Sequence, residues 1–450
     1  MAVHRNSQDY DDIGAPMPLD AGLGPDGTRR RALSDRKALR AVCRVVARRH
    51  RSERQGRRRR VHSAGVEGRP GPVEEVIGLS TLQVEYTEAE LLADHEVAEP
   101  LMAKGVRCHG GFNGTGEYVS PRTKNRWPAI RAWEQQRLEQ FSSPILDIPL
   151  ESWPENFPNV EQSKLLLRNG VREPTISALT RIGTVEGFGV MLRTLAIPDF
   201  ERSFDEDIAG TAVAHIDGGL FEAHARDEAG FDDEAGHNVM WFVARDIAFE
   251  DPVTEDQTAR MLARMGIGAG PRTDAELTAM RDAARAARAL PDDIDFTLEV
   301  LAGRMIGLLL IEISAFHGFA WAEALLSDPD LVAGDGEAAR IIGYIRSDEA
   351  PHVAWLRTAL SEMRDRTWVG EHGEKHKGSE MISRLWDRAV SDSLLLRRQD
   401  NLKFVLHEIE LATAHRRDAA DLLEEMLSLG TVVRRPDGSL VDEQSPQLLG

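Results

Sequence analysis

The stretches DEAGH (residues 233–237) and DEAPH (residues 348–352) share the pattern D-E-x-x-H. A chain of this composition would contain roughly 0.1 such match by chance, so two copies indicate a shared purpose. On a helix, positions i and i+3 lie on one face, which lets the glutamate and the histidine of each motif bind the same cation. The repetition predicts a metal site built from two similar halves.

Each motif follows a glutamate in apolar surroundings. Glu312 lies within LLLIEI (308–313), with 35 residues between it and Asp348. Glu186 precedes GFGVML (187–192), with 46 residues between it and Asp233. A carboxylate in such a setting is costly unless a cation binds it. The predicted metal ligands are therefore Glu186, Glu234, His237, Glu312, Glu349 and His352.

Glu186 is the least certain member of this set. It could instead pair with Arg181 or Arg193, and its longer spacing leaves room for Glu201 or Glu222 to take its place. Glu201 follows a loop-like stretch and is the reserve candidate. Glu312 has no such competitor, because Arg304 is two helical turns away.

The second helical segment contains further polar residues. We interpret His215, His224 and Glu222 as surface groups or as groups that support the ligands. Asp227 precedes Glu234 by seven residues, on the same helical face, and is interpreted as a gate. The aspartates of the two motifs, Asp233 and Asp348, are expected to hydrogen-bond the histidine of the opposite motif.

The rest of the sequence predicts an all-α fold. Strand signals are scarce, and helical patterns cover residues 174–196, 207–249, 293–326, 336–366 and 379–427. Thr87 and Glu90 form a capping-box pattern, which predicts a short helix. The glycine-rich stretch 108–121 is predicted to be a loop without a nucleotide-binding role. Pro351 is expected to kink its helix.

The expected organisation has four parts: a basic arm (1–75), an accessory region (76–172), a di-metal bundle (173–370) and C-terminal helices with a tail (371–450). Residues 28–62 hold 15 Lys or Arg against two acidic residues, although the whole chain has a net charge of −19. Such a run repels itself, so the arm is predicted to be disordered and dispensable. Two cysteines exclude a disulfide scaffold or a cysteine-rich metal site.

The six predicted ligands resemble the paired E…ExxH set of the ferritin-like di-iron carboxylate superfamily. Residues 312–352 also resemble the looser E-x(28–37)-D-E-x-x-H pattern of bacterial arylamine N-oxygenases. The resemblance implies a ferritin-like four-helix bundle with accessory helices and two bound iron ions, with manganese as an alternative. The N-oxygenases add a histidine one turn before the second ExxH glutamate, where this chain has Ile345.

The resemblance implies a cytoplasmic oxygenase that activates dioxygen to hydroxylate or N-oxygenate a small organic metabolite. An external ferredoxin or reductase would supply electrons, because the chain carries no flavin, nicotinamide or iron–sulfur motif. A homodimer is possible, and neither a membrane nor a nucleic acid is an expected partner. The alternatives are a manganese or iron protein of the peroxide-disproportionating or ferroxidase type, and a metal-free helical binding protein.

Overall fold

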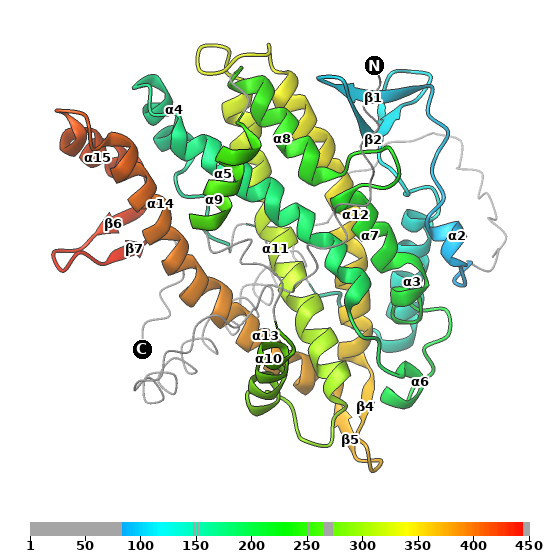
Figure 1. Cartoon of the computed structure of the whole chain (residues 1–450). Helices are drawn as coiled ribbons and strands as arrows, with labels where there is room; N and C mark the ends of the chain where they lie inside the picture. Colours follow the sequence, from blue (N-terminus) through cyan, green and yellow to red (C-terminus); the bar gives the residue numbers. More distant parts are fainter. Residues whose placement is uncertain (1–82, 147–149, 151–152, 251–252, 265–272, 444–450) are drawn as a thin grey trace, which may run out of the picture.

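The computed structural model describes residues 83–146, 150, 153–250, 253–264 and 273–443, and the arm predicted at 1–75 lies outside them. The described chain is mostly helical, as predicted, but it also contains three small antiparallel sheets that an all-α fold does not include (Figure 1). Among the described helices, none combines the length and the apolar composition needed to cross a bilayer.

The α-helices are α2 (Glu88–Leu91), α3 (Arg126–Phe141), α4 (Val160–Arg168), α5 (Glu173–Glu186), α6 (Phe200–Ser203), α7 (Phe221–Ala229), α8 (His237–Ala248), α9 (Glu255–Arg264), α10 (Asp274–Ala286), α11 (Phe296–Leu326), α12 (Glu337–Asp365), α13 (Gly378–Ser391), α14 (Arg398–Thr413) and α15 (Ala419–Ser428). Tighter or wider helical turns form η4 (Gly187–Thr194), η5 (Val213–His215), η6 (Ile216–Leu220) and η7 (Asp392–Arg397). The strands are β1 (Glu99–Ala103), β2 (Val106–Phe112), β3 (Tyr118–Val119), β4 (Thr367–Val369), β5 (Lys375–Lys377), β6 (Val432–Arg434) and β7 (Leu440–Asp442).

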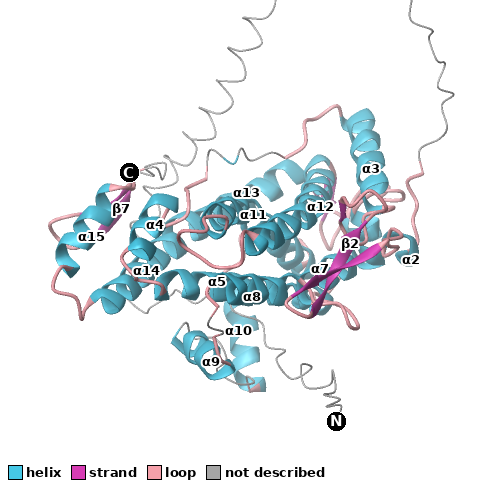
Figure 2. Ribbon diagram, turned by 90° about the horizontal axis from the view of Figure 1, so that it is seen from above, coloured by secondary structure: helices cyan, strands magenta, loops and turns pink. Residues whose placement is uncertain are grey.

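The centre of the molecule is surrounded by helices α5, α7, α8, α11 and α12. The two longest, α11 and α12, pack along each other, α8 packs against both α5 and α12, and α7 packs against η4 and α8. Seen from above, α5, α8 and α7 form one layer beside α11 and α12 (Figure 2). The remaining C-terminal elements, α14, α15 and the β6–β7 hairpin, pack with α4 and α5 around their own apolar cluster.

The apolar core is divided into two clusters along α11 and α12. One cluster contains α11 up to Ile313 and α12 from Trp355 onward. The other contains α11 from Phe319 and α12 up to Ile345. The helices therefore carry a polar layer between two apolar ones, and this layer is where the predicted ligands of both helices lie.

The first sheet corrects the loop prediction for residues 108–121. Within that stretch, β2 pairs with β1 and β3 in the order β1-β2-β3, and Cys108 and His109 of β2 are completely buried. The sheet also holds the segment between α7 and α8, because the His109 amide donates to the Ala235 carbonyl and the Ala235 amide donates to the Arg107 carbonyl. The capping box of Thr87 and Glu90 is present at the start of α2, as predicted.

Candidate metal centre

The first glutamate of the centre, Glu186, is the last residue of α5. Its helix lies directly on α8, because a Cβ atom at Gly183 would come within 2.8 Å of the Phe242 ring and 2.9 Å of Trp241. Glu186 Oε2 is 3.9 Å from His237 Nδ1, and the Glu186 side chain is 11% exposed. The structure therefore brings Glu186 to the centre, whereas Glu201 is exposed on α6 and Glu222 pairs with Arg193 at the surface.

Helix α7 contributes two residues that the motif search did not select as ligands. His224 and Glu228 are four residues apart on one face, and both are buried. A Cβ atom at Gly189 would lie 2.2 Å from Glu228 Cγ, so η4 rests directly on this glutamate. The interpretation of His224 as a surface or supporting group does not match its position among the buried glutamates.

The motif at 233–237 is not helical, contrary to prediction. Helix α7 ends at Ala229 and α8 begins at His237, so residues 230–236 form the connection between them. Glu234 and Asp233 lie in this connection and form ion pairs with Arg107 at 2.8 and 2.9 Å. The structure brings His237 to the centre and leaves Glu234 and Asp233 outside it, because the glycines at 230 and 236 end one helix and precede the next.

The motif at 348–352 lies on α12, as predicted. Asp348, Glu349 and His352 are completely buried, and Glu312 on α11 is 5% exposed. The helix continues from Glu337 to Asp365 through Pro351. These residues are held on two long, mutually packed helices, which fixes their positions relative to one another.

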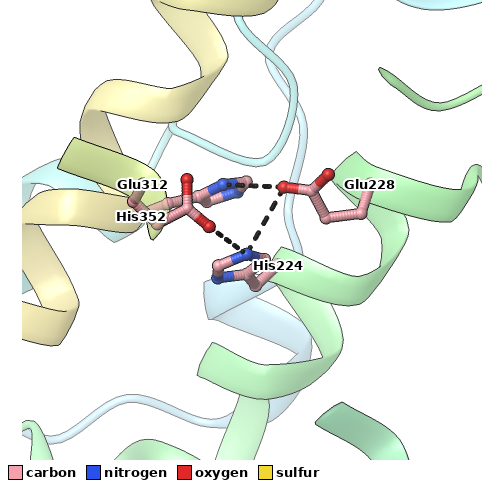
Figure 3. Close-up of side chains that lie close together, drawn as sticks. All are labelled: His224, Glu228, Glu312 and His352. Atoms are coloured by element: carbon pink, nitrogen blue, oxygen red, sulfur yellow. Dashed lines mark ion pairs between the residues drawn. The ribbon is translucent and has the colours of Figure 1, made fainter. Parts of the chain in front are cut away.

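Among the described residues, ligand-type side chains form three groups in which one nitrogen or oxygen atom of each residue lies within 4.8 Å of those of the others. One of the three, His109, His237 and Asp348, contains no glutamate, and the other two share Glu228. The first group contains His224, Glu228, Glu312 and His352 (Figure 3). In it, His224 Nε2 is 3.1 Å from Glu312 Oε1 and 3.4 Å from Glu228 Oε1. His352 Nδ1 is 3.3 Å from Glu228 Oε1, so all four side chains converge.

The second group contains Glu186, Glu228, His237 and Glu349. His237 Nδ1 is 2.8 Å from Glu349 Oε1 and 3.5 Å from Glu228 Oε2. Glu228 therefore belongs to both groups, with one carboxylate oxygen facing each. Glu349 also faces both, because its other oxygen, Oε2, is 2.6 Å from His352 Nδ1. Two carboxylates thus link the groups into one centre of four glutamates and three histidines.

A buried aspartate supports the histidine of the first group. Asp227 Oδ2 is 2.9 Å from His352 Nε2, and the guanidinium groups of Arg122 and Arg126 contact the same carboxylate. Although burial opposes ionisation, the two arginines hold the pKa of Asp227 well below its usual range. The predicted contact of an aspartate with His352 exists, but Asp227 makes it in place of Asp233.

Asp348 has the corresponding position in the second group, as predicted. Its Oδ2 atom is 3.5 Å from His237 Nε2 and 3.1 Å from His109 Nε2. Tyr118 donates its hydroxyl to Asp348 at 2.8 Å, and the Ser120 hydroxyl donates to the other oxygen. Although burial opposes ionisation, the neighbouring His109 and His237 bring the pKa of Asp348 down to about 2.

The four central glutamates face histidines, and the pKa values differ among them. Although burial opposes its ionisation, His224 brings the pKa of Glu312 down to about 2. Burial raises the pKa of Glu228 well above its usual range, and the nearby Glu349 and Glu186 add to the effect. Burial likewise raises the pKa of Glu349, with repulsion from Glu312. Although burial opposes its charge, the carboxylates of Glu349 and Glu228 raise the pKa of His237 well above 6.5. The raised pKa values of Glu228 and Glu349 therefore reflect burial and the repulsion among carboxylates held close together.

The donor and acceptor atoms of the centre fit metal ions better than they fit one another. Several completely buried atoms make no aligned hydrogen bond despite their closeness: both ring nitrogens of His224 and of His237, both carboxylate oxygens of Glu228, and Oε1 of Glu349. Buried polar atoms are rarely left in this state, and atoms that converge on a shared point are typical of cation ligands. These buried histidine and glutamate groups could hold metal ions.

Of the six predicted ligands, the structure brings five together and leaves out Glu234. The sequence reasoning missed Glu228 and His224, although HARDE (224–228) is the D-E pair with its histidine on the N-terminal side. On a helix this order places the histidine on the same face as the glutamate just as well. His109 and Tyr118 were missed because nothing in the sequence placed the sheet beside the centre.

No protein-family model, curated protein sequence or solved structure matches this chain. The residues of the centre therefore carry the functional argument.

Proposed function

We propose that this chain is a di-iron oxygenase of ferritin-like type, which activates dioxygen to oxidise a small organic molecule. The charge of the centre is the observation that carries the proposal. Arg122 and Arg126 both contact Asp227, whereas the carboxylates of Glu186, Glu228, Glu312 and Glu349 lie among histidines and one another. Two divalent cations match their charge, and unpaired carboxylates in such a place would cost several kcal/mol each, in order of magnitude.

The arrangement of the donors also supports two metal ions. Glu228 and Glu349 each face both groups and would bridge the ions, while Glu312 with His224 and His352 would bind one, and Glu186 with His237 the other. The extra histidine of the arylamine N-oxygenases, absent at Ile345, has a counterpart in His224, which stands one turn before Glu228. An additional histidine among the ligands is the feature shared with the N-oxygenases, and it favours oxygenation over simple iron storage as the function of this centre.

Iron bound at this centre would supply the electrons that reduce dioxygen and the oxidising power that acts on the substrate. Transfer of one oxygen atom to the substrate and reduction of the other to water consumes two electrons and two protons, besides the two electrons that the substrate loses. The iron would pass on these two electrons, an external ferredoxin or reductase would replace them, and the solvent would provide the protons. The chain contributes a dry setting, because apolar clusters cover the centre above and below along α11 and α12. Asp227 and Asp348 orient His352 and His237.

Metal loading followed by exposure to dioxygen tests the proposal. We expect the metal-free chain to take up two Fe(II) ions without oxygen, and then to consume dioxygen with a change in its near-ultraviolet and visible absorption. Uptake of two ions with rapid destruction of peroxide but no dioxygen consumption would assign the chain to the peroxide-disproportionating alternative. A chain that binds no metal and is unaffected by chelator would overturn the proposal in favour of a binding protein.

A further inference from the structure

The eight residues that follow Glu186 differ from the other walls of the centre. Helix α5 changes at Gly187 into the 3₁₀ helix η4, and 3₁₀ runs longer than about four residues are uncommon and often mark a hinge. Only Leu192 of the eight residues is buried, whereas the ligand-bearing parts of α7, α11 and α12 are buried. The segment therefore contacts the centre with one face and exposes more of its side chains than those helices do.

The position of η4 makes it a cover for the centre. It packs on α7, and Gly189 lies against Glu228 so closely that a Cβ atom there would overlap Glu228 Cβ and Cγ. Its first residue follows Glu186 directly, and the Glu186 side chain is the most exposed of the four glutamates at 11%. Movement of η4 away from α7 would therefore uncover Glu186 and Glu228 together.

The far end of η4 is held by charge. Arg193 donates from Nε and Nη2 to the two carboxylate oxygens of Glu222 on α7, at 2.7 and 3.2 Å. Glu222 also accepts from Arg226 Nε at 2.7 Å, which fixes its position. The Arg193 and Glu222 side chains are 33% and 23% exposed, so their contact is worth about 1 kcal/mol at most and can open readily.

We propose that η4 is a movable cover closed by the Arg193–Glu222 ion pair, and that it admits an apolar organic substrate to the Glu186 side of the centre. This inference rests on the proposed function, for which it names an access route and a substrate class. The Glu186 side has two ligands of its own, Glu186 and His237, whereas the other side has three, which leaves more room for an incoming molecule. Before Arg193 the cover offers only glycines and apolar side chains, in the sequence GFGVML.

Hydrogen exchange of the full chain without metal tests the cover itself. We expect the amides of residues 187–194 to exchange faster than those of residues 175–184 in α5. The Arg193→Gln variant should accelerate their exchange by up to about fivefold, which corresponds to the loss of about 1 kcal/mol. The Gly187→Ala variant should slow it, because alanine suits the helical backbone at Gly187 and stiffens it.

A matched control removes an ion pair of similar exposure far from the centre. Arg434→Gln breaks the contact between Arg434 and Glu410 in the C-terminal region and should leave exchange at 187–194 unchanged. Equal exchange in the parent chain and in the Arg193→Gln variant would overturn the proposed cover. Because this measurement uses no metal, it decides on the cover even if the chain fails to bind iron, which would overturn the proposed function instead.

The apolar substrate class is tested with a fluorescent apolar probe, N-phenyl-1-naphthylamine, and with protein loaded with either Co(II) or Zn(II). We expect the probe to bind both forms and to be quenched only by Co(II), because the probe would lie close to the metal. The Val190→Glu variant should weaken probe binding at least fivefold while two Co(II) ions still bind. Absence of probe binding, or binding without Co(II) quenching, would overturn the apolar substrate class.

Discussion

The candidate metal centre has two halves, one formed by residues of α11 and α12 and the other by residues of α5, α7 and α8, and they are built differently. Glu312, Glu349 and His352 lie on α11 and α12, two long helices that continue well beyond the centre at both ends. Glu186, Glu228 and His237 lie at the end of α5, near the end of α7 and at the start of α8. The contrast shows that equivalent ligands can come from continuous helices in one half and from helix ends in the other. The ligands at helix ends depend more on their connections.

The largest difference should come from substituting Glu228, which belongs to both groups of ligand-type side chains. Glu228→Gln removes a carboxylate that faces both groups, so we expect the loss of both metal ions. Glu234→Gln is the matched control: Glu234 lies three residues before the start of α8, in an ion pair with Arg107, and the variant should retain two ions. Metal content after dialysis measures the effect. Retention by the first variant and loss by the second would restore Glu234 as the ligand.

The next largest difference should be in the free energy of unfolding, between variants of Asp227 and of Asp348. Asp227→Asn leaves the buried Arg122 and Arg126 without their carboxylate, which should lower the free energy of unfolding by about 3–5 kcal/mol. Asp348→Asn keeps Tyr118 and His109 as hydrogen-bonding neighbours and should lower it by about 1–3 kcal/mol. Urea unfolding of the metal-free variants, followed by circular dichroism, measures both. The reverse order would show that Arg122 and Arg126 find other partners.

A smaller effect, on the affinity for Co(II), is expected from a substitution at the contact between η4 and α7. Gly189→Ala places a methyl group within 2.2 Å of Glu228 Cγ, so either the segment or the glutamate must shift. We expect the affinity for Co(II) to fall by about 10- to 100-fold, as for other changes that displace a ligand. Gly187→Ala serves as control, because its methyl group would meet Asn238 at an ordinary 3.4 Å. Equal affinities in the two variants would show that η4 yields without disturbing Glu228.

The smallest effect, on stability and on Co(II) release, should come from a substitution in β2, the strand that holds the α7–α8 connection. Arg107→Gln removes the ion pairs with Asp233 and Glu234, and the Arg107 side chain is 46% exposed, so stability should change by no more than about 1 kcal/mol. We expect Co(II) to be released to a chelator up to about fivefold faster, since the connection joins Glu228 to His237. The corresponding change at Arg416, paired with Asp418 away from the centre, should leave release unchanged.

The same contrast explains what the sequence could predict. Within α11 and α12 the spacing of residues converts directly into position, so Glu312, Glu349 and His352 were predicted together with their helices. Between α7 and α8 a break in the helix at Gly230 was expected, and Gly230 has a positive φ there. The prediction nevertheless made residues 233–237 helical, whereas the connection continues to residue 236. The motif therefore predicts Glu234 as the ligand, whereas Glu228 is the glutamate that lies in the centre.

Other parts of the centre depend on contacts between distant segments. His109 and Tyr118 reach Asp348 only because β2 and β3 fold against the α7–α8 connection, more than 200 residues before Asp348 in the chain. Local patterns such as helical periodicity and capping carry no information about such contacts. The glycine-rich composition of residues 108–121 favoured a loop, although Gly110 and Gly111 lie within β2.

The burial of Cys108 protects its thiol from oxidation. This residue precedes His109 in β2, and burial raises the pKa of its thiol to about 11. At neutral pH only roughly one thiol in ten thousand would then be ionised. Because the thiolate is the form that reacts with peroxides, a neutral and enclosed thiol resists conversion to sulfenic and sulfinic acids. A sulfur atom can thus remain reduced beside a centre that would handle dioxygen.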